Sequence, residues 1–202
     1  KKAIKLKPDY VEAYYNLGIA LKKYGKLEES IENYQKLLKI NPGYYEAYSN
    51  YLFGLLYLTK YDHQHYITVA KKFRYNLKKI ENELCVAYQY NKNPKKLKIG
   101  FVSGDFKEHP VGFFLLDTLS YLKNKNLDLI AYSNSLKKDS LTLKLKSHFT
   151  KWREIADLDD VEVINQIRED GIHILFDLSG HSAKNRLPIF VSKPAPLQVS
   201  WV

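Results

Sequence analysis

With 202 residues, of which 45% are hydrophobic, the chain is long enough for one large or two small domains with a buried core. Its formal net charge of +10 would suit nucleic-acid binding, but the lysines are scattered, which favours solvated helix faces and no nucleic-acid partner. The single cysteine, Cys85, excludes an internal disulfide and fits a reducing compartment such as the cytoplasm. No apolar run approaches the roughly 18 residues of a membrane span, so we expect no membrane segment.

Charge and tyrosine content divide the chain in two. Residues 1–97 hold 18 Lys and Arg against 9 Asp and Glu, a net charge of +9, whereas residues 98–202 hold 14 against 13, a net charge of +1. Of the 17 tyrosines, 15 precede residue 97. We therefore predict helical repeats over residues 1–80, a linker over residues 81–97 and a second domain over residues 98–202.

The first part of the chain contains a repeat of 34 residues. Pro8 and Pro42 are separated by this distance, and each is followed by Glu-Ala-Tyr, at Glu12–Tyr14 and Glu46–Tyr48. A period of 34 is the length of the tetratricopeptide repeat, a pair of antiparallel helices. We predict one complete copy at Val11–Tyr44, with residues 1–7 as the tail of a preceding copy.

The interior of this repeat has the expected apolar and small positions. One helix face would be formed by Tyr14, Leu17, Gly18 and Leu21, and the facing one by Ser30, Tyr34 and Leu37, with Gly25 at the turn between them.

A second repeat begins at Tyr45, and its second helix is predicted over His65–Ile80. His63 and His65 have no Cys or carboxylate cluster beside them, so we interpret them as part of a solvated loop and not as a metal site. Glu81–Lys96 is a polar connector in which Cys85 is a packed small side chain.

The second part alternates short apolar runs with amphipathic segments, which indicates a parallel, doubly wound α/β sheet. The predicted strands are Ile99–Ser103, Leu127–Ser133, Lys151–Ile155, Ile172–Leu178 and Leu197–Val202, and the predicted helices are Val111–Leu122, Leu141–His148, Asp159–Asp170 and Arg186–Val191. His148 would end a helix and His173 would lie inside a strand, so both are interpreted as structural.

The loops after the first and fourth of these strands carry the candidate site residues. His109 is the candidate catalytic residue, and the candidate substrate-binding residues are Asp105, Pro110, Gly180, His181, Asn185 and Arg186. Asp105, His109 and Pro110 follow the first strand, and Gly180, His181, Asn185 and Arg186 follow the fourth. In open α/β sheets, ligands bind at the carboxyl ends of the strands, so neighbouring strands would bring both histidines to one cleft. Histidine is suited to proton transfer near neutral pH, and Arg186 to neutralising a phosphate. Asp177 would orient His181 or satisfy loop amides.

Two other kinds of site fit poorly. The sequences around Ser103 and Ser179 lack the Gly-x-Ser-x-Gly pattern of a nucleophilic serine. Gly100 and Gly104 do not form the GxGxxG pattern of a dinucleotide-binding loop.

Several motifs together resemble one known family. They are Lys98–Phe106 (KIGFVSGDF) with His109-Pro110, Asp170–Leu175 (DGIHIL), Asp177–His181 (DLSGH), Asn185–Leu187 (NRL) and Lys193–Trp201 (KPAPLQVSW). Preceded by a tetratricopeptide repeat, they resemble the O-GlcNAc transferase/SPINDLY glycosyltransferases, particularly the bacterial members. The resemblance extends over essentially the whole chain.

This resemblance implies a GT-B fold, in which two Rossmann-like lobes hold a nucleotide sugar between them, and here the N-terminal lobe. It implies transfer of a sugar to Ser or Thr of proteins without metal or cofactor, with UDP-GlcNAc or GDP-fucose as donor and the repeats holding the acceptor protein. The family histidine considered as a base or positioning group corresponds to His109. Arg168 stands where some relatives have a second histidine.

The chain ends where the family continues into its second lobe, so we expect a fragment that is inactive alone and binds a nucleotide sugar weakly or not at all. His181, Asn185 and Arg186 would shape the sugar and acceptor side of the cleft. The alternative is a repeat scaffold whose α/β lobe only binds proteins. The oligomeric state is not predicted.

Overall fold

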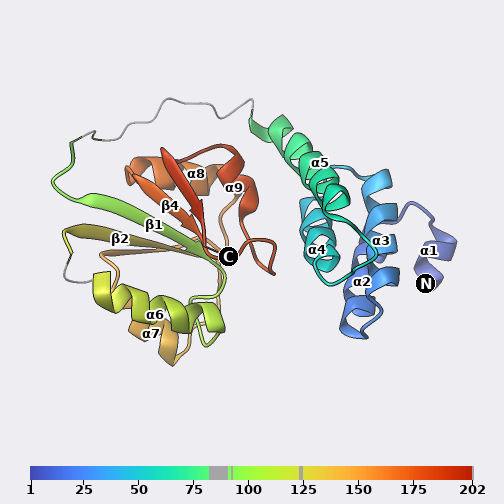
Figure 1. Ribbon diagram of the computed structural model, residues 1–202, viewed down its shortest axis with the longest axis horizontal. Helices are drawn as coiled ribbons and strands as arrows, with labels where there is room; N and C mark the ends of the chain where they lie inside the picture. The colour runs from blue at the N-terminus through green and yellow to red at the C-terminus, as the bar shows by residue number, and fades with distance from the viewer. Residues whose placement is uncertain (82–90, 92, 123–124, 202) are drawn as a thin grey trace. The chain divides into compact units, whose positions relative to one another are not determined.

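The structure, a computed structural model, describes residues 1–81, 91, 93–122 and 125–201, with the backbone alone at residues 78–81. It divides into two compact units, Lys1–Asn82 and Glu83–Val202. Figure 1 shows helices alone in the first unit and a sheet with flanking helices in the second. The predicted fold class, a helical repeat followed by a parallel α/β lobe, is confirmed.

The first unit contains five helices among its described residues, α1 (Lys2–Leu6), α2 (Val11–Lys23), α3 (Leu27–Ile40), α4 (Tyr45–Leu55) and α5 (His63–Glu81). The close approach of α2 and α3 depends on small residues, because the Oγ of Ser30 donates a 2.7 Å hydrogen bond to the carbonyl oxygen of Gly18. The ring of Tyr34 packs so tightly on Gly18 that an added Cβ there would lie 2.5 Å from it. Gly25, with φ of 73°, makes the turn.

His63 lies in a helix and not in the predicted solvated loop, whereas His65 lies inside the helix that was predicted over His65–Ile80. Both residues belong to the first turn of α5, which begins two residues before the predicted start. The backbone N–H of His65 donates to the Oδ1 of Asp62 at 2.7 Å, and the ring Nε2 lies 2.8 Å from the hydroxyl of Tyr51 on α4. These contacts anchor the start of α5 against α4.

The second unit is built on a five-stranded parallel sheet in the order β3-β2-β1-β4-β5. The strands are β1 (Leu97–Ser103), β2 (Leu127–Ser133), β3 (Lys151–Glu154), β4 (Ile174–Asp177) and β5 (Leu197–Ser200). The helices are α6 (Pro110–Leu122), α7 (Ser140–Lys146), α8 (Asp160–Glu169) and α9 (Leu187–Val191). The chain crosses from β3 on one side of β1 to β4 on the other side.

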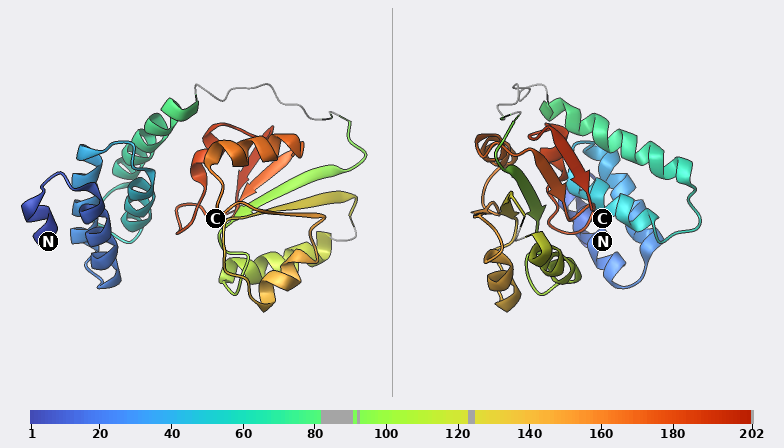
Figure 2. Two further views of the ribbon diagram at one scale, coloured as in Figure 1. Left: turned by 180° about the vertical axis from the view of Figure 1, so that it is seen from behind. Right: turned by 60° about the vertical axis from the view of Figure 1, so that its left-hand side comes forward.

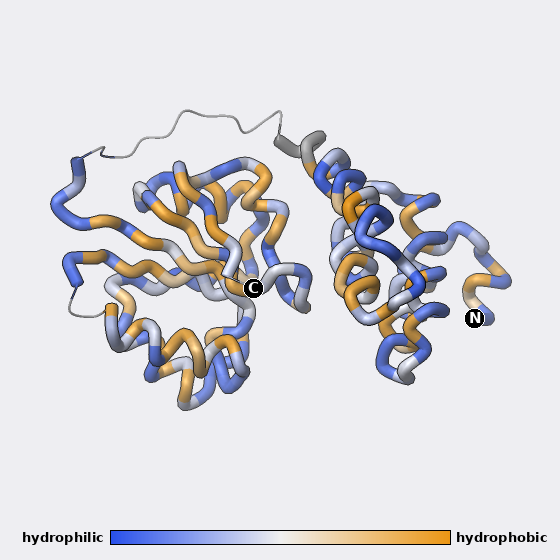
Figure 3. Tube along the Cα trace, in the orientation of Figure 1, coloured by the Kyte–Doolittle hydropathy of each residue, from blue (hydrophilic) through white to orange (hydrophobic). Residues whose placement is uncertain are grey.

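Alternating side chains of the strands bury both faces of the sheet. Figures 1 and 2 show α6 and α7 on one face and α8 and α9 on the other. One core contains Ile99 and Phe101 of β1 with Leu115 and Leu145 of the helices, and the other contains Val102 with Ile164 and other side chains. Figure 3 shows that β1, β2 and β4 are hydrophobic along much of their length, as strands buried on both faces require.

The fourth strand is shorter than predicted. It begins at Ile174, so His173 lies just before the strand and not inside it. The ring of His173 accepts a 3.1 Å hydrogen bond from the backbone N–H of Lys98 at Nδ1, and its Nε2 lies 3.1 Å from the carbonyl oxygen of Asn91. These contacts tie the start of β1 to the segment before it.

The predictions for Cys85, for most of the 81–97 linker and for Val202 fall outside the described residues. Within the described part of the chain, no helix combines the length and apolar character that crossing a membrane requires.

Candidate functional site

The candidate site lies at the topological switch point of the sheet, between β1 and β4, where the strand order reverses. β1 pairs in parallel with both β2 and β4, so the loops that follow these strands leave the same edge of the sheet. In doubly wound sheets this switch point opens a crevice for ligands. Because β1 and β4 are neighbours, the structure brings the β1 loop, with Asp105, His109 and Pro110, beside the β4 loop, with Gly180 and His181.

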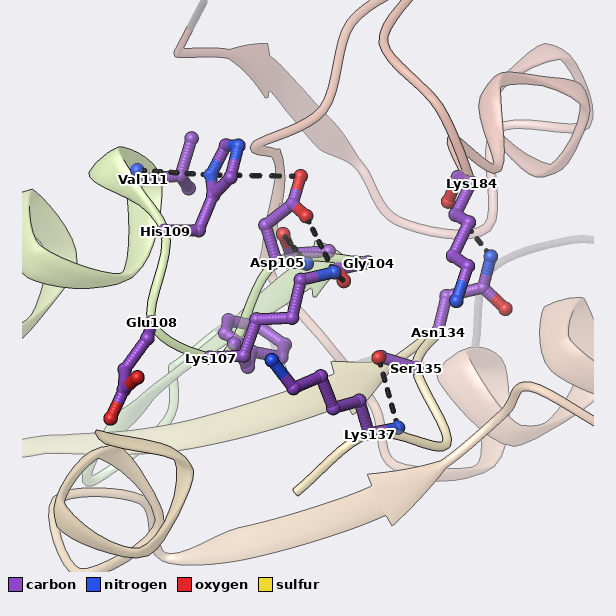
Figure 4. A network of polar contacts seen from close by, with 12 residues as sticks. Gly104, Asp105, Lys107, Glu108, His109, Val111, Asn134, Ser135, Lys137 and Lys184 are labelled. Carbon is purple, nitrogen blue, oxygen red and sulfur yellow. Dashed lines mark hydrogen bonds and ion pairs between the residues drawn. The ribbon is translucent and has the colours of Figure 1, made fainter. Parts of the chain in front are cut away.

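The β1 loop presents a small polar network (Figure 4). Asp105 is buried, and its Oδ1 lies 3.0 Å from the Nζ of Lys107, while its Oδ2 lies 3.9 Å from the Nδ1 of His109. The backbone N–H of Val111 donates to the same Nδ1 at 3.3 Å. Because Nδ1 accepts this hydrogen bond, the neutral ring of His109 carries its proton on Nε2. The side chain of His109 is 40% exposed, so Nε2–H can meet a ligand.

The first turn of α7 braces this loop. The Oδ2 of Asp139 accepts a 2.9 Å hydrogen bond from the backbone N–H of Glu108, and the hydroxyl of Thr142 donates to the carbonyl oxygen of Phe106 at 2.7 Å. Asp139 and Thr142 also form the capping box of α7. The Glu108 N–H is the main reason why the pKa of Asp139 lies below its usual value. The backbone that carries His109 is therefore held by another helix.

Three strand-end loops meet at Gly104. A Cβ on Gly104 would lie 2.9 Å from the Cβ of Lys184 in the loop after β4. Asn134, after β2, donates from its Nδ2 to the carbonyl oxygen of Lys184 at 2.8 Å. Lys184 adopts a φ of 61°, a conformation that this hydrogen bond helps to hold. Figure 4 shows the side chains of Lys137 and Lys184 in the β2 and β4 loops, with Lys184 beside Asn134.

Asp177 organises the start of the β4 loop. Its two carboxylate oxygens each accept a 3.0 Å hydrogen bond, one from the N–H of Ser179 and one from the N–H of Gly180. These two contacts show that Asp177 satisfies loop amides, which is one of its two predicted roles. Burial raises the pKa of Asp177, while these hydrogen bonds oppose the rise. Burial also lowers the pKa of His181 to about 4, so this ring is neutral near pH 7.

The side chains of Asn185 and Arg186 are engaged within the protein. The amide of Asn185 bonds the carbonyl oxygen of Ser182 at 2.8 Å and the N–H of Leu187 at 3.3 Å. Both terminal nitrogens of Arg186 donate to the carbonyl oxygen of Leu158 at 3.1 Å, and Nη2 lies 2.8 Å from the Oδ1 of Asp160. With 11% of its side chain exposed, Arg186 braces α8 and α9.

An ionic network centred on the buried carboxylate of Asp170 lies at the opposite, amino edge of the sheet. The carboxylate of Asp170 accepts hydrogen bonds from the Nζ of Lys151 at 2.5 Å and from the guanidinium of Arg153 at 2.7 and 3.1 Å. It also accepts one from the hydroxyl of Tyr132 at 2.8 Å. Burial by itself would raise the pKa of Asp170, but the hydrogen bonds from Arg153, Lys151 and Tyr132 outweigh it and lower this pKa. The Asp-Gly-Ile motif therefore serves stability here, away from the candidate cleft.

Lys107, Asp139 and Thr142 are the contributors that sequence reasoning missed. The spacing of Asp139 and Thr142 before an apolar run was an available signal for a helix cap, but nothing local indicates that the same aspartate holds Glu108, 31 residues away. For metal binding, the described residues contain no group of three or more His, Cys, Asp or Glu placed to hold an ion.

The fold and the site together define a tetratricopeptide protein joined to a Rossmann-like lobe with a polar site at its switch point. The tetratricopeptide profile matches residues 11–44, which confirms the predicted complete copy, and the profile of glycosyl transferase family 41 matches residues 48–202. The chain belongs to glycosyl transferase family 41. This match begins within α4, so the family unit includes the second helical pair.

Similar proteins point to the same family. The rice (Oryza sativa subsp. japonica) protein described as a probable UDP-N-acetylglucosamine–peptide N-acetylglucosaminyltransferase SPINDLY is 37% identical over 118 residues, 54% of this chain and 13% of that protein. A Caenorhabditis elegans UDP-N-acetylglucosamine–peptide N-acetylglucosaminyltransferase is 29% identical over 54% of this chain and 10% of its own length.

Among solved structures, a point variant of the Thermobaculum terrenum O-GlcNAc transferase superposes with a TM-score of 0.87 and 33% identity. That comparison covers 98% of this chain and 38% of the other. The match to the curated SPINDLY relatives spans about an eighth of their length, 13% in each case.

Proposed function

We propose that this chain supplies the repeat region and the first lobe of a protein O-glycosyltransferase, which transfers GlcNAc from UDP-GlcNAc to Ser or Thr hydroxyls of proteins. The observation that supports it most is the family match across residues 48–202, joined to a braced His109 loop at the switch point of the sheet. We favour UDP-GlcNAc over GDP-fucose because the similar rice and Caenorhabditis elegans proteins are described as UDP-N-acetylglucosamine–peptide N-acetylglucosaminyltransferases.

The transfer requires an acceptor hydroxyl to attack the anomeric carbon, to lose its proton and to displace the nucleoside diphosphate. With Nδ1 accepting the Val111 N–H, neutral His109 offers Nε2–H as a hydrogen-bond donor and has no free lone pair for a proton. We assign His109 the orientation of the acceptor or of a donor oxygen. Asp105 and Pro110 hold its loop, and Gly180 and His181 border the cleft. Asn185 and Arg186 shape it through internal contacts.

Substitution of His109 separates an orienting role from a proton-accepting one. In the whole protein that contains this chain, His109→Ala should lower transfer to a peptide by about 100-fold or more. His109→Gln keeps an N–H donor and should retain activity within about tenfold of wild type. Equal losses in both variants would assign proton acceptance to the ring, and unchanged turnover in both would remove His109 from the mechanism.

The controls keep the comparison interpretable. His63→Ala removes an exposed histidine from α5 and should leave transfer unchanged. Each variant is accepted only if its thermal unfolding matches that of wild type. The assay is run with UDP-GlcNAc and with GDP-fucose, and absence of transfer from both donors, with peptide binding retained, would favour the scaffold alternative.

We assign acceptor binding to the repeat unit, which carries a cavity of about 600 Å³ between α3, α4 and α5. Lys71 and Lys72 line it together with Tyr48 and Tyr75, and the described lining residues include no carboxylate. This lining suits acidic segments of an acceptor protein that carry an apolar anchor.

Peptide binding measures this assignment. Anisotropy of a fluorescent acidic peptide should show weaker binding to Lys71→Glu/Lys72→Glu than to the equally charged control Lys23→Glu/Lys144→Glu, whose lysines are exposed on other helices. Equal binding by the two double variants would contradict a specific role for the cavity.

A further inference from the structure

The side chain of Lys107 is unusually enclosed for a loop lysine. Only 18% of it is exposed, because it folds back over its own turn, in which the N–H of Lys107 donates to the carbonyl oxygen of Asp105 at 2.8 Å. Its Nζ donates to the carbonyl oxygen of Gly104 at 2.8 Å and lies 3.0 Å from the Oδ1 of Asp105. Ordering such a flexible side chain costs conformational entropy, so these contacts must offset that cost.

The carboxylate of Asp105 has two possible cationic neighbours. Its side chain is 10% exposed, and a carboxylate so enclosed requires compensation for the water it has lost. The ammonium of Lys107 compensates it through Oδ1, at 3.0 Å. His109 would compensate it through Oδ2, at 3.9 Å, only if its ring took a second proton.

We propose that Lys107 is a positioning residue that keeps the ring of His109 neutral by occupying the Asp105 carboxylate. With Lys107 in place, Nδ1 of His109 accepts the N–H of Val111, as Figure 4 shows. The proton of the neutral ring is therefore on Nε2. The ring orientation that the proposed transfer uses thus depends on a lysine that acts through Asp105. The catalytic meaning of this inference rests on the proposed function.

The electrostatic consequence has a definite sign. Without the Lys107 ammonium, the enclosed carboxylate attracts a proton to Nδ1, which then donates toward Asp105 and releases the N–H of Val111. Without the Asp105 charge, this attraction disappears. Among the described residues, Asp105 is the charged group within ion-pair distance of His109. The other titratable groups of the surrounding loops are Glu108, Lys137, Asp139, His181 and Lys184.

An NMR titration of the histidine rings in the 202-residue chain tests the inference without any assay of transfer. The resonances of His109 are assigned by their absence in His109→Gln. Lys107→Met removes the charge and keeps the stem, and it should raise the pH midpoint of the His109 resonances by about one unit. Asp105→Asn should lower the midpoint, and Lys107→Arg should restore the wild-type midpoint.

The matched control is Lys137→Met, which removes an exposed positive charge from the neighbouring β2 loop. Its midpoint shift should be at most a few tenths of a unit, because solvent screens an exposed charge. Equal shifts in Lys107→Met and Lys137→Met, or none in Lys107→Met, would overturn the proposal. If Lys107→Met fails to fold, Lys107→Gln replaces it, since its amide still donates to Gly104.

A second measurement connects the inference to transfer. In the whole protein, the acidic limb of the pH–rate profile should move to higher pH in Lys107→Met and return in Lys107→Arg. A shift of the NMR midpoint without transfer at any pH would support the role of Lys107 and contradict the proposed function. Transfer with an unmoved midpoint and an unmoved acidic limb would support the proposed function and contradict the role of Lys107.

Discussion

The α-carbon of Gly112, in the first turn of α6, packs directly on the carbonyl oxygen of Lys107, leaving no room for a Cβ. The same Cβ would also lie 3.1 Å from the carbonyl oxygen of Asp105. Both neighbours are backbone atoms of the loop that carries His109, and backbone atoms cannot move aside as a flexible side chain can. The glycine thus lets the helix begin directly against the site loop.

Gly112→Ala should therefore destabilise the α/β unit by about 2 kcal/mol, within the range measured for overpacked sites. It should also displace the loop and move the NMR resonances of His109. Both tryptophans, Trp152 and Trp201, belong to this unit, so tryptophan fluorescence during urea unfolding follows it.

Gly54→Ala is the matched control, because its Cβ would lie 3.4 Å from the side chain of Ile31 in the middle of the first unit. This substitution should change stability by no more than about 1 kcal/mol in far-UV circular dichroism. An unaltered α/β unit in Gly112→Ala would show that the loop can shift freely.

Asp170 should make a large contribution to stability, because its carboxylate is 5% exposed and satisfies three side chains. Asp170→Asn leaves Lys151 and Arg153 without a counter-charge and should cost about 2 to 4 kcal/mol, allowing for their partial exposure. Asp128→Asn is the control, since its 3.7 Å pair with Lys96 is solvated and should contribute less than about 1 kcal/mol.

The pH dependence of the Asp170 effect follows from its lowered pKa. The stabilisation is fully present above the usual value of 3.8, and it is lost as the pH falls through the lower value of the folded protein. Urea unfolding of wild type and Asp170→Asn between pH 7 and pH 3 should give a constant difference in stability down to about pH 4, shrinking below it. A difference that vanishes already at pH 6 would contradict this assignment.

His181 should make the protein sensitive to acid. Burial lowers its pKa from 6.5 to about 4, so between these values the unfolded chain takes up a proton that the folded chain does not. Stability is therefore intact above pH 6.5 and falls by up to about 3 kcal/mol by pH 4. His181→Gln should flatten this part of the stability profile, and His63→Gln, on the surface, should leave its slope as in wild type.

Substitution of Arg186 distinguishes a structural role of its side chain from phosphate binding. Because its guanidinium donates to Leu158 and pairs with Asp160, Arg186→Lys should lower the unfolding free energy by about 1 to 2 kcal/mol. The control Lys184→Ala removes an exposed neighbour and should be close to neutral. A variant Arg186→Lys of wild-type stability with a raised KM for the donor would establish phosphate binding instead.

Much of this architecture was readable from local pattern. The spacing of Pro8 and Pro42 and the small residues at Gly18 and Ser30 determined the repeat, because helix packing of this kind requires a fixed period and close approach. The strand Leu127–Ser133 was predicted with its observed bounds, since an apolar run between polar turns specifies a buried strand. The placement of His109 at the carboxyl edge followed from the same alternation of strands and helices.

Tertiary structure decided which side chains share a partner. The bond from Glu108 to Asp139 spans 31 residues and that from Arg186 to Leu158 spans 28, so no local period could reveal them. The same holds for the contact between the ring of His65 and the hydroxyl of Tyr51, which joins two helices across 14 residues. Periodicity reports which face of an element is buried, whereas partners depend on how separate elements pack, because hydrogen bonds and ion pairs act only over a few ångströms.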